Sequence, residues 1–445
     1  MASAVEQLAK NANFGALAKA TELKQRILFV IGALIVYRLG THIPIPGIDT
    51  QAWSQFFSDP SKSGGILGMF NMFSGGALSR MTIFALNIMP YISASIIMQL
   101  ASAMSKKLEE LKKEGEVGRM KINQYTRYLT VLLAAVQAYG MSIGLEASGT
   151  VIDPGMFFRV STVITIVGGT VFLMWLGEQI TSRGVGNGIS LIIFAGIVAE
   201  LPRAIASALD LGQEGTLHPM VLFMLAVMVV AVIALIVFVE RAHRRVVVQY
   251  PKRQVGNRLM GGETNHIPLK INTAGVIPPI FASSLLLLPL TVIGMMSFDN
   301  TELRSFIESN LAHGQPAYMI LYGLLVAFFC FFYTAIVFNP EENAETLRKY
   351  GGFVPGIRPG KNTADHLDYV LTRISTIGAI YLVFICLLPE FLIAKYSLPF
   401  YFGGTSLLIV VSVTMDTVAQ VHSHLIAHQY EGLVKNTKLR GRNRR

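Results

Sequence analysis

The stretch Gly65–Leu100, GILGMFNMFSGGALSRMTIFALNIMPYISASIIMQL, decides how this chain folds. A short apolar piece, residues 66–73, is followed by Ser-Gly-Gly, and a longer apolar piece runs from residue 77 to about 101. Only the longer piece reaches the roughly 20 residues that a membrane-spanning helix needs. Irregular backbone at membrane depth is tolerated only where protein buries it or where it lines a wet cavity. The pattern therefore predicts a re-entrant half-helix folded into the protein, as a stopper inside a channel would be.

The composition indicates a membrane protein along the whole chain. Of the 445 residues, 52% are hydrophobic and only 14% are charged, whereas soluble domains carry about 25% charged residues. The two cysteines, Cys330 and Cys386, both lie in apolar runs, so we expect neither a disulfide framework nor a metal pair. Residues 1–26 contain no apolar signal-peptide core, so we expect the first span to be retained.

Ten apolar runs are long enough to be spans, and the links between them differ in charge. Lys and Arg are dense in the links 102–123, 240–273 and 339–372 and in the tail 425–445, while the links on the other side hold only Lys62, Arg304 and Lys395. This bias sets membrane orientation and predicts that both termini are cytoplasmic. The predicted spans are 22–40, 77–101, 124–145, 155–176, 188–204, 217–239, 274–296, 316–338, 373–392 and 402–424.

Ten spans divide into five and five at the external link 205–216. Because five is odd, the second half enters the membrane from the opposite side, which is the arrangement of inverted repeats around a central pathway. We predict an all-α integral membrane protein with ten transmembrane helices, in which an N-terminal half (1–204) and a C-terminal half (217–424) surround a pore that contains the re-entrant plug. The basic tail, 425–445, follows.

Six isoleucines stand beside glycine or proline breaks in the apolar runs. Isoleucine in a membrane helix commonly packs against neighbours or faces lipid, so each one alone is weak evidence. Together they are candidates for an apolar constriction, which can gate a pore by excluding water. They are Ile88, Ile92, Ile189, Ile193, Ile280 and Ile409.

Intramembrane charge separates the classes of transport protein. Ion-coupled transporters usually keep acidic residues inside their spans, whereas this chain has few, with Asp416 the main one. A secondary transporter of small solutes therefore stays an alternative to a channel, and a ribosome-binding module is a third. No enzymatic motif survives inspection: GIRPGKN (356–362) lacks a Ser or Thr after its Lys, and GVGNG (184–188) follows a span instead of a strand. We expect no enzyme, cofactor or metal.

The two long basic links, 240–273 and 339–372, exceed what orientation requires and are candidates for docking surfaces. Charged and β-branched residues alternate in 240–260, which predicts a short hairpin. Arg358 lies between Gly356 and Pro359-Gly360, on a turn that would hold a guanidinium outward. An exposed Arg is well suited to recognising carboxylate or phosphate.

Nine runs of this sequence closely resemble the SecY family, the channel subunits of bacterial protein translocases. The resemblance covers nearly the whole chain, from about Leu23 to Tyr430. The runs are IPIPGID (43–49), FNMFSGGALSR (70–80), IMPYISASII (88–97), MWLGEQIT (174–181), GNGIS (186–190), AGVIPPIFASS (274–284), FFYTAIVFNP (331–340), FVPGIRPG (353–360) and PFYFGGTSLLIVV (399–411).

The resemblance implies a passive channel in the bacterial inner membrane. Unfolded secretory chains would pass through the isoleucine ring after the plug moves, and apolar segments would leave into lipid through a lateral gate between the second and third spans and the seventh and eighth. The driving energy would come from the motor ATPase SecA or from the ribosome. The implied partners are SecE, SecG, SecA, the ribosome, signal sequences and secretory or nascent polypeptides, and anionic phospholipids, with SecDF and YidC as further partners.

The resemblance also assigns roles to residues of this chain. The six isoleucines become the pore ring, and two family positions differ here, Pro279 and Asn87, where small residues and glycine are common. The implied plug is Ile66, Leu67, Met69, Phe70, Asn71, Met72, Phe73, Ser74, Gly75 and Gly76; the polar gate positions are Gln137 and Asn272; and the SecA and ribosome docking residues are Arg244, Arg245, Lys252, Arg253 and Arg358.

Overall fold

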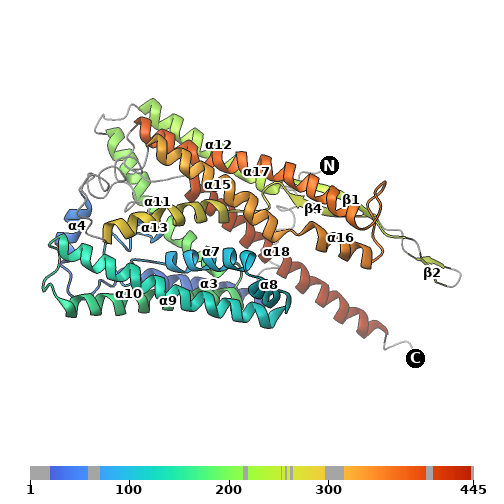
Figure 1. Ribbon diagram of the computed structural model, residues 1–445, viewed down its shortest axis with the longest axis horizontal. Coiled ribbons are helices and arrows are strands. Elements are labelled where there is room, and N and C mark those ends of the chain that lie inside the picture. The colour runs from blue at the N-terminus through green and yellow to red at the C-terminus, as the bar shows by residue number, and fades with distance from the viewer. Residues whose placement is uncertain are drawn as a thin grey trace.

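The computed structural model describes residues 21–58, 71–213, 219–251, 253–255, 258–260, 264–295, 315–396 and 404–441. Long helices run side by side, with the strands, α8 and α16 at one end, here called the strand end, and α4 at the other, the α4 end (Figure 1). The helices are α3 (Thr21–Gly40), α4 (Thr50–Ser58), α7 (Met89–Met104), α8 (Lys106–Lys113), α9 (Glu116–Ala147), α10 (Met156–Arg183), α11 (Gly188–Gln213), α12 (Pro219–Arg241), α13 (Ile277–Met295), α15 (Pro316–Val337), α16 (Pro340–Lys349), α17 (Lys361–Tyr396) and α18 (Gly404–Gly441).

The helices present apolar side chains outward as well as inward. Phe223, Phe238, Ile320 and Phe384 are each more than half exposed, and a protein in water rarely leaves so much large apolar surface uncovered. Seven helical stretches of the described chain are long and apolar enough to cross a membrane, and α7 and the described start of α13 are shorter apolar helices. The chain is therefore a multi-pass membrane protein, as predicted, while the count of ten spans stays a prediction.

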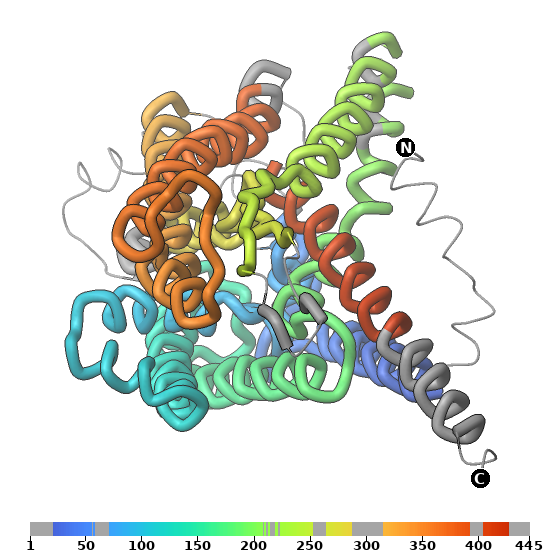
Figure 2. The backbone as a smooth tube through the Cα atoms, turned by 90° about the vertical axis from the view of Figure 1, so that its right-hand side faces the viewer, coloured from blue at the N-terminus to red at the C-terminus, as the bar shows by residue number. Residues whose placement is uncertain are grey.

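The helices gather in two groups that meet at α13. In Figures 1 and 2, α3, α7, α9 and α10 lie on one side and α12, α15 and α17 on the other. Within the groups, α9 packs on α10 and α7, and α15 packs on α17 and α13. Between the groups, α13 packs on both α7 and α9, while α18 packs on α11, α12 and α17. The largest core cluster of buried apolar residues runs through both groups.

The prediction of a span that begins at residue 77 is wrong. Helix α7 begins only at Met89, with Pro90 in its first turn, and the backbone before it forms successive turns. Met81 (φ 45°) and Asn87 (φ 50°) occupy the left-handed region, which is uncommon for residues other than glycine. This irregular backbone is apolar in composition and mostly buried. Its polar backbone groups are satisfied in part by the loop after α3, for example where the Ile45 N–H donates to the Met81 carbonyl.

Four helices extend well beyond the predicted spans. Helix α9 starts at Glu116 instead of 124 and α17 at Lys361 instead of 373, while α11 runs to Gln213 instead of 204 and α18 to Gly441 instead of 424. The prediction ended each span where charges begin. A helix can continue past that point because its backbone hydrogen bonds are internal, and none of these extensions contains a proline.

The 240–273 link contains the predicted hairpin, but in a longer form. Strand β1 (His243–Gln249) pairs antiparallel with β4 (Thr264–Lys270), beyond the expected 240–260, and the short strands β2 (Arg253–Val255) and β3 (Arg258–Met260) pair farther out. The alternation of charged and valine residues puts Val246 and Val248 of β1 on the buried face. There Val246 and Leu269 pack with Val354 and Leu367 of the 339–372 link, so that the two links form one body.

Candidate functional site: an apolar ring and the segment that closes it

Four of the six predicted ring isoleucines surround one small cavity in the middle of the molecule. Ile88 and Ile92 come from the start of α7, Ile193 from α11 and Ile280 from α13. The cavity has a volume of ≈ 10 Å³, about the room that a single water needs. Phe73, Asn87, Met89 and Ser283 complete the lining. The isoleucines therefore converge from three helices on a nearly closed, mainly apolar point.

The other two ring candidates lie outside this lining. Ile189 is one turn before Ile193 on α11 and packs beside Gly177 of α10: its Cγ1 is 3.3 Å from the place that a Cβ on Gly177 would take. Ile409 is fully buried on α18, within the same large core cluster. The structure thus brings four candidates together at the cavity and leaves the roles of Ile189 and Ile409 as predictions.

The described part of the predicted plug is residues 71–76, here called the closing segment after its predicted role. Asn71 to Phe73 are helical, and the buried Phe73 reaches the cavity. Gly75 (φ 65°) and Gly76 (φ 78°) then reverse the chain in a conformation that only glycine adopts at little cost. The remaining predicted plug residues, Ile66, Leu67, Met69 and Phe70, lie outside the described residues.

Carbonyl groups of the closing segment accept hydrogen bonds from side chains of α3 and of the turn before α7. The Asn87 amide donates to the Phe73 carbonyl at 2.6 Å, and the Tyr37 hydroxyl donates to the Ser74 carbonyl at 3.3 Å. The Arg38 guanidinium donates to the Gly75 carbonyl at 2.7 Å. Three successive carbonyls are thus held from α3 and from the turn before α7.

Helix α11 approaches the same segment backbone to backbone. A Cβ placed on Gly196 would lie 2.7 Å from the Phe73 carbonyl oxygen and 3.3 Å from the Gly75 nitrogen. A Cβ on Gly75 would in turn lie 2.9 Å from the Gly196 Cα. Because neither glycine has a side chain, the segment lies directly on α11.

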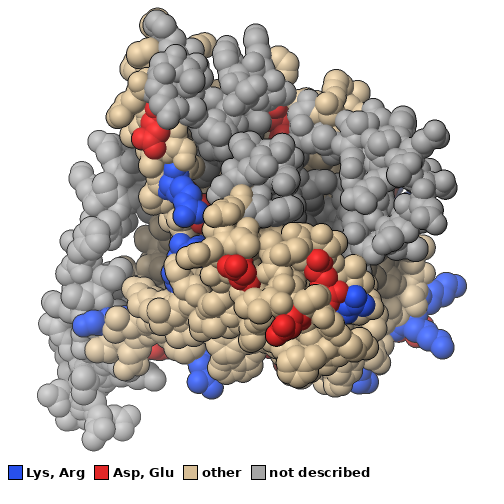
Figure 3. All heavy atoms as spheres, turned by 90° about the vertical axis from the view of Figure 1, so that its left-hand side faces the viewer, with Lys and Arg blue, Asp and Glu red and all other residues tan. Residues whose placement is uncertain are grey.

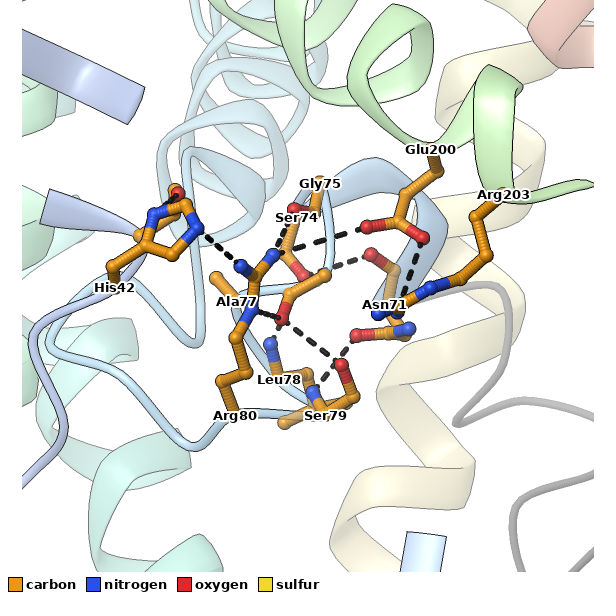
Figure 4. Close-up of polar contacts among 12 residues, drawn as sticks. His42, Asn71, Ser74, Gly75, Ala77, Leu78, Ser79, Arg80, Glu200 and Arg203 are labelled. Carbon is orange, nitrogen blue, oxygen red and sulfur yellow. Dashed lines mark hydrogen bonds and ion pairs between the residues drawn. The ribbon is translucent and has the colours of Figure 1, made fainter. Parts of the chain in front are cut away.

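Arg80 contacts the glycine turn of the closing segment, α11 and the loop after α3 (Figure 4). Its Nε donates to the Gly76 carbonyl at 2.9 Å and its Nη2 to the Gly75 carbonyl at 3.0 Å. The same guanidinium lies 3.9 Å from the Glu200 carboxylate of α11 and 2.6 Å from His42 Nε2. Arg80 therefore ties the glycine turn to α11 and to the loop after α3.

Sequence reasoning missed most of these anchoring groups. Tyr37, Arg38, His42 and Gly196 belong to no sequence pattern that predicts an anchoring role. Asn87 did carry a signal, because the SecY resemblance places glycine there. The structure explains why asparagine is accepted: asparagine is enriched in the left-handed region among residues other than glycine, and its side chain also reaches the closing segment.

The predicted lateral gate corresponds to the contacts of α13 with α7 and α9. Gln137 lies in α9, and its Oε1 is buried without a hydrogen-bond partner. Asn272 is buried just before α13 and donates to the Glu240 carboxylate of α12 at 2.6 Å. No hydrogen bond joins Gln137 to Asn272 within the described part of the chain, so their pairing in a gate stays a prediction.

The predicted docking residues lie at the strand end. Arg358 is exposed on a turn between Gly356 (φ 82°) and Gly360 (φ 107°), and its carbonyl accepts from the Thr363 hydroxyl at 2.9 Å. Arg244 and Arg245 are exposed on β1. Arg253 begins β2, and Lys252 lies outside the described residues. The turn holds the Arg358 backbone and leaves its side chain in solvent.

The α4 end has a different charge pattern. Seen from that side, described acidic and basic side chains are scattered among uncharged residues (Figure 3). At the strand end, Arg244, Arg245 and Arg358 are exposed together with Lys349 and Lys361, and α16 adds the exposed acidic residues Glu341 and Glu342. Which end faces the cytoplasm stays a prediction from the Lys and Arg bias.

Comparison with known proteins gives a consistent result. The family model described as SecY matches residues 82–418. Protein translocase subunit SecY of Rickettsia conorii is 57% identical over 424 residues, covering 94% of this chain and 97% of the relative. The same-named protein of Escherichia coli K12 is 54% identical over 428 residues, covering 95% and 96%.

Solved structures share the fold. "The structure of a protein conducting channel" superposes with a TM-score of 0.60 at 18% identity, covering 90% of this chain and 92% of the other. Sec61 in a canine ribosome–channel complex gives a TM-score of 0.57 at 18% identity, with coverage of 90% and 92%. With a family match over most of the chain and relatives above 50% identity, this chain belongs to the SecY family.

Proposed function

We propose that this chain is a protein-conducting channel and that the structure describes its closed form. The observation that carries the proposal is the ≈ 10 Å³ cavity between Ile88, Ile92, Ile193 and Ile280, with Phe73 packed into its lining. A ring of branched apolar side chains resists water and ions and can widen around an extended polypeptide without leaving a charged group unpaired. The relatives that match nearly the full chain are named protein translocase subunits, which supports this reading.

The conducting step begins with displacement of the closing segment. Its carbonyls are held by hydrogen bonds from neutral and charged donors, each worth about 0.5–3 kcal/mol net. A signal sequence that opens the contacts of α13 with α7 and α9 would separate the two groups of helices and widen the ring. Segments that are apolar enough would leave through the same opening into lipid, favoured by about 25 cal/mol per Å² of apolar surface buried.

In this proposal, the chain provides the path for the polypeptide, and partner proteins provide the energy for its movement. The Arg358 turn and the β1–β4 hairpin offer exposed guanidinium groups on a packed base, which suits recognition of acidic surfaces or phosphate. We assign them to docking of SecA and the ribosome; one solved relative is a Sec61 channel in a ribosome complex. The proposal includes SecE and SecG as companion subunits, a bacterial inner-membrane location with cytoplasmic termini, and no catalytic activity in this chain.

Crosslinking tests the pathway directly. A photo-crosslinker is placed at Ile92, in the cavity, and in a matched variant at Leu235, which is 37% exposed on α12. A stalled secretory precursor is added to full-length channel in membranes with SecA and ATP. Adducts at Ile92 alone are the expected result. With insertion and SecA activity verified, the absence of adducts at Ile92 would contradict the channel and favour the secondary transporter of small solutes.

A further inference from the structure

His42 contacts Arg80, the residue that ties the glycine turn of the closing segment to α11. The imidazole Nε2 lies 2.6 Å from Arg80 Nη1, and the imidazole Nδ1 lies 2.9 Å from the Arg38 carbonyl oxygen (Figure 4). A guanidinium has only donors to offer and a carbonyl only lone pairs. Nε2 must therefore accept and Nδ1 must donate, which specifies the neutral imidazole with its proton on Nδ1.

The charged groups around this imidazole are mostly cationic. Arg80 is its direct neighbour, and Glu200 and Arg203 of α11 lie beyond Arg80. Arg38 of α3 contacts the imidazole through its backbone carbonyl, while its guanidinium donates to the Gly75 carbonyl. Thr41 is the nearest polar side chain, 3.4 Å from Nδ1. A proton on Nε2 would place two N–H donors and two positive charges face to face, while the bond from Nδ1 to the Arg38 carbonyl would stay favourable. Protonation thus acts against the contact with Arg80 in particular.

We propose that His42 is a positioning residue for Arg80 and makes closure of the channel sensitive to pH at the α4 end. With neutral His42, Arg80 is held where it donates to the Gly75 and Gly76 carbonyls. With protonated His42, Arg80 is repelled, the glycine turn loses two charge-assisted hydrogen bonds, and the closing segment is released more often. The inference depends on the proposed function, in which residues 71–76 seal the channel, and on the orientation that places the α4 end outside.

The primary test is the conductance of the resting full-length channel in a planar bilayer, with pH changed only on the α4 side. The pH is stepped from 7.5 to 5.5, the range over which histidine side chains in proteins change charge. We expect wild-type resting conductance to rise over this range. The His42→Gln variant should show no such rise, and His42→Lys should conduct at both pH values. His266→Gln, at the strand end, should keep the wild-type profile.

A second readout separates this inference from the channel itself. Nitrogen-15 NMR of labelled histidine, as the difference between wild type and His42→Gln, should show the Nδ1-protonated neutral ring at pH 7.5. The Nε2-protonated form, or a flat wild-type conductance while Ile92→Asn conducts, would overturn the role of His42 and leave the channel intact. If Ile92→Asn and Gly196→Ala also fail to conduct, the closing segment itself is wrong.

Discussion

A single added methyl group at Gly196 tests whether the closing segment is held against α11. In Gly196→Ala, the new Cβ would lie 2.7 Å from the Phe73 carbonyl oxygen, 3.1 Å from the Tyr37 hydroxyl and 3.3 Å from the Gly75 nitrogen. Two of these three atoms belong to the closing segment. Overpacking of this kind costs about 1–3 kcal/mol. Movement of the segment away from α11 relieves most of the strain, so the cost falls on the closed state.

That cost corresponds to a shift of about five- to 150-fold in the ratio of closed to open channels. Alanine also favours a helix over glycine by up to about 1 kcal/mol, but this gain applies equally to both states and does not change the ratio. We therefore expect a higher resting conductance and export of precursors with defective signal sequences, without loss of the folded protein.

The matched control is Gly144→Ala in α9, where an added Cβ meets nothing within 4 Å. Resting conductance of both variants is measured in planar bilayers, and thermal unfolding is measured in detergent. If Gly196→Ala unfolds at the wild-type temperature and conducts no more than Gly144→Ala, the segment is not held by α11 and the reasoning fails.

Three further substitutions test other parts of the molecule. Ile92→Asn puts an amide into the apolar cavity, so we expect a leakier ring and export of defective signal sequences; normal signal discrimination would contradict this, with Leu235→Asn as the outward-facing control. Arg358→Glu should abolish SecA-driven transport of a precursor into vesicles while the protein still inserts, and Arg348→Glu on α16 should not; unchanged transport in the first variant would rule out the docking role. Asn87→Ala loses a hydrogen bond and strains a left-handed residue by about 1–2 kcal/mol, so it should raise resting conductance more than Asn87→Gly; equal conductance would mean that backbone conformation there is unimportant.

The apolar runs predicted the membrane class and the approximate place of each helix because hydropathy is a local property of sequence. The break at Ser74-Gly75-Gly76 was also readable, since glycine marks reversals of the chain. The start of α7 could not be predicted, because residues 77–88 are as apolar as a membrane-spanning helix. They differ from one only in how their backbone groups are hydrogen-bonded. That pairing comes from the loop after α3, about 40 residues away, and no local pattern contains it.

The residues of the site also fall into those that sequence patterns predict and those that they do not. Isoleucine spacing beside glycine and proline breaks picked out four residues that do line one cavity. The anchoring groups could not be found by this approach, since Arg38 and Tyr37 look like ordinary residues at a helix end until the Gly75 and Ser74 carbonyls are placed beside them. Side chains that bond to backbone carbonyls leave no complementary residue type in the sequence to search for.

The shared base of the two links has a mechanical consequence. Val354 and Leu367 pack with Val246 and Leu269, and the Phe353 backbone pairs with Gln249, so the Arg358 turn and the hairpin cannot be pushed separately. A protein that pushes on one of them also pushes on the other, and the force reaches α12 and α17 together. Under the proposed docking function, two large partners would therefore compete for one body, and a motor and a ribosome would bind it one at a time.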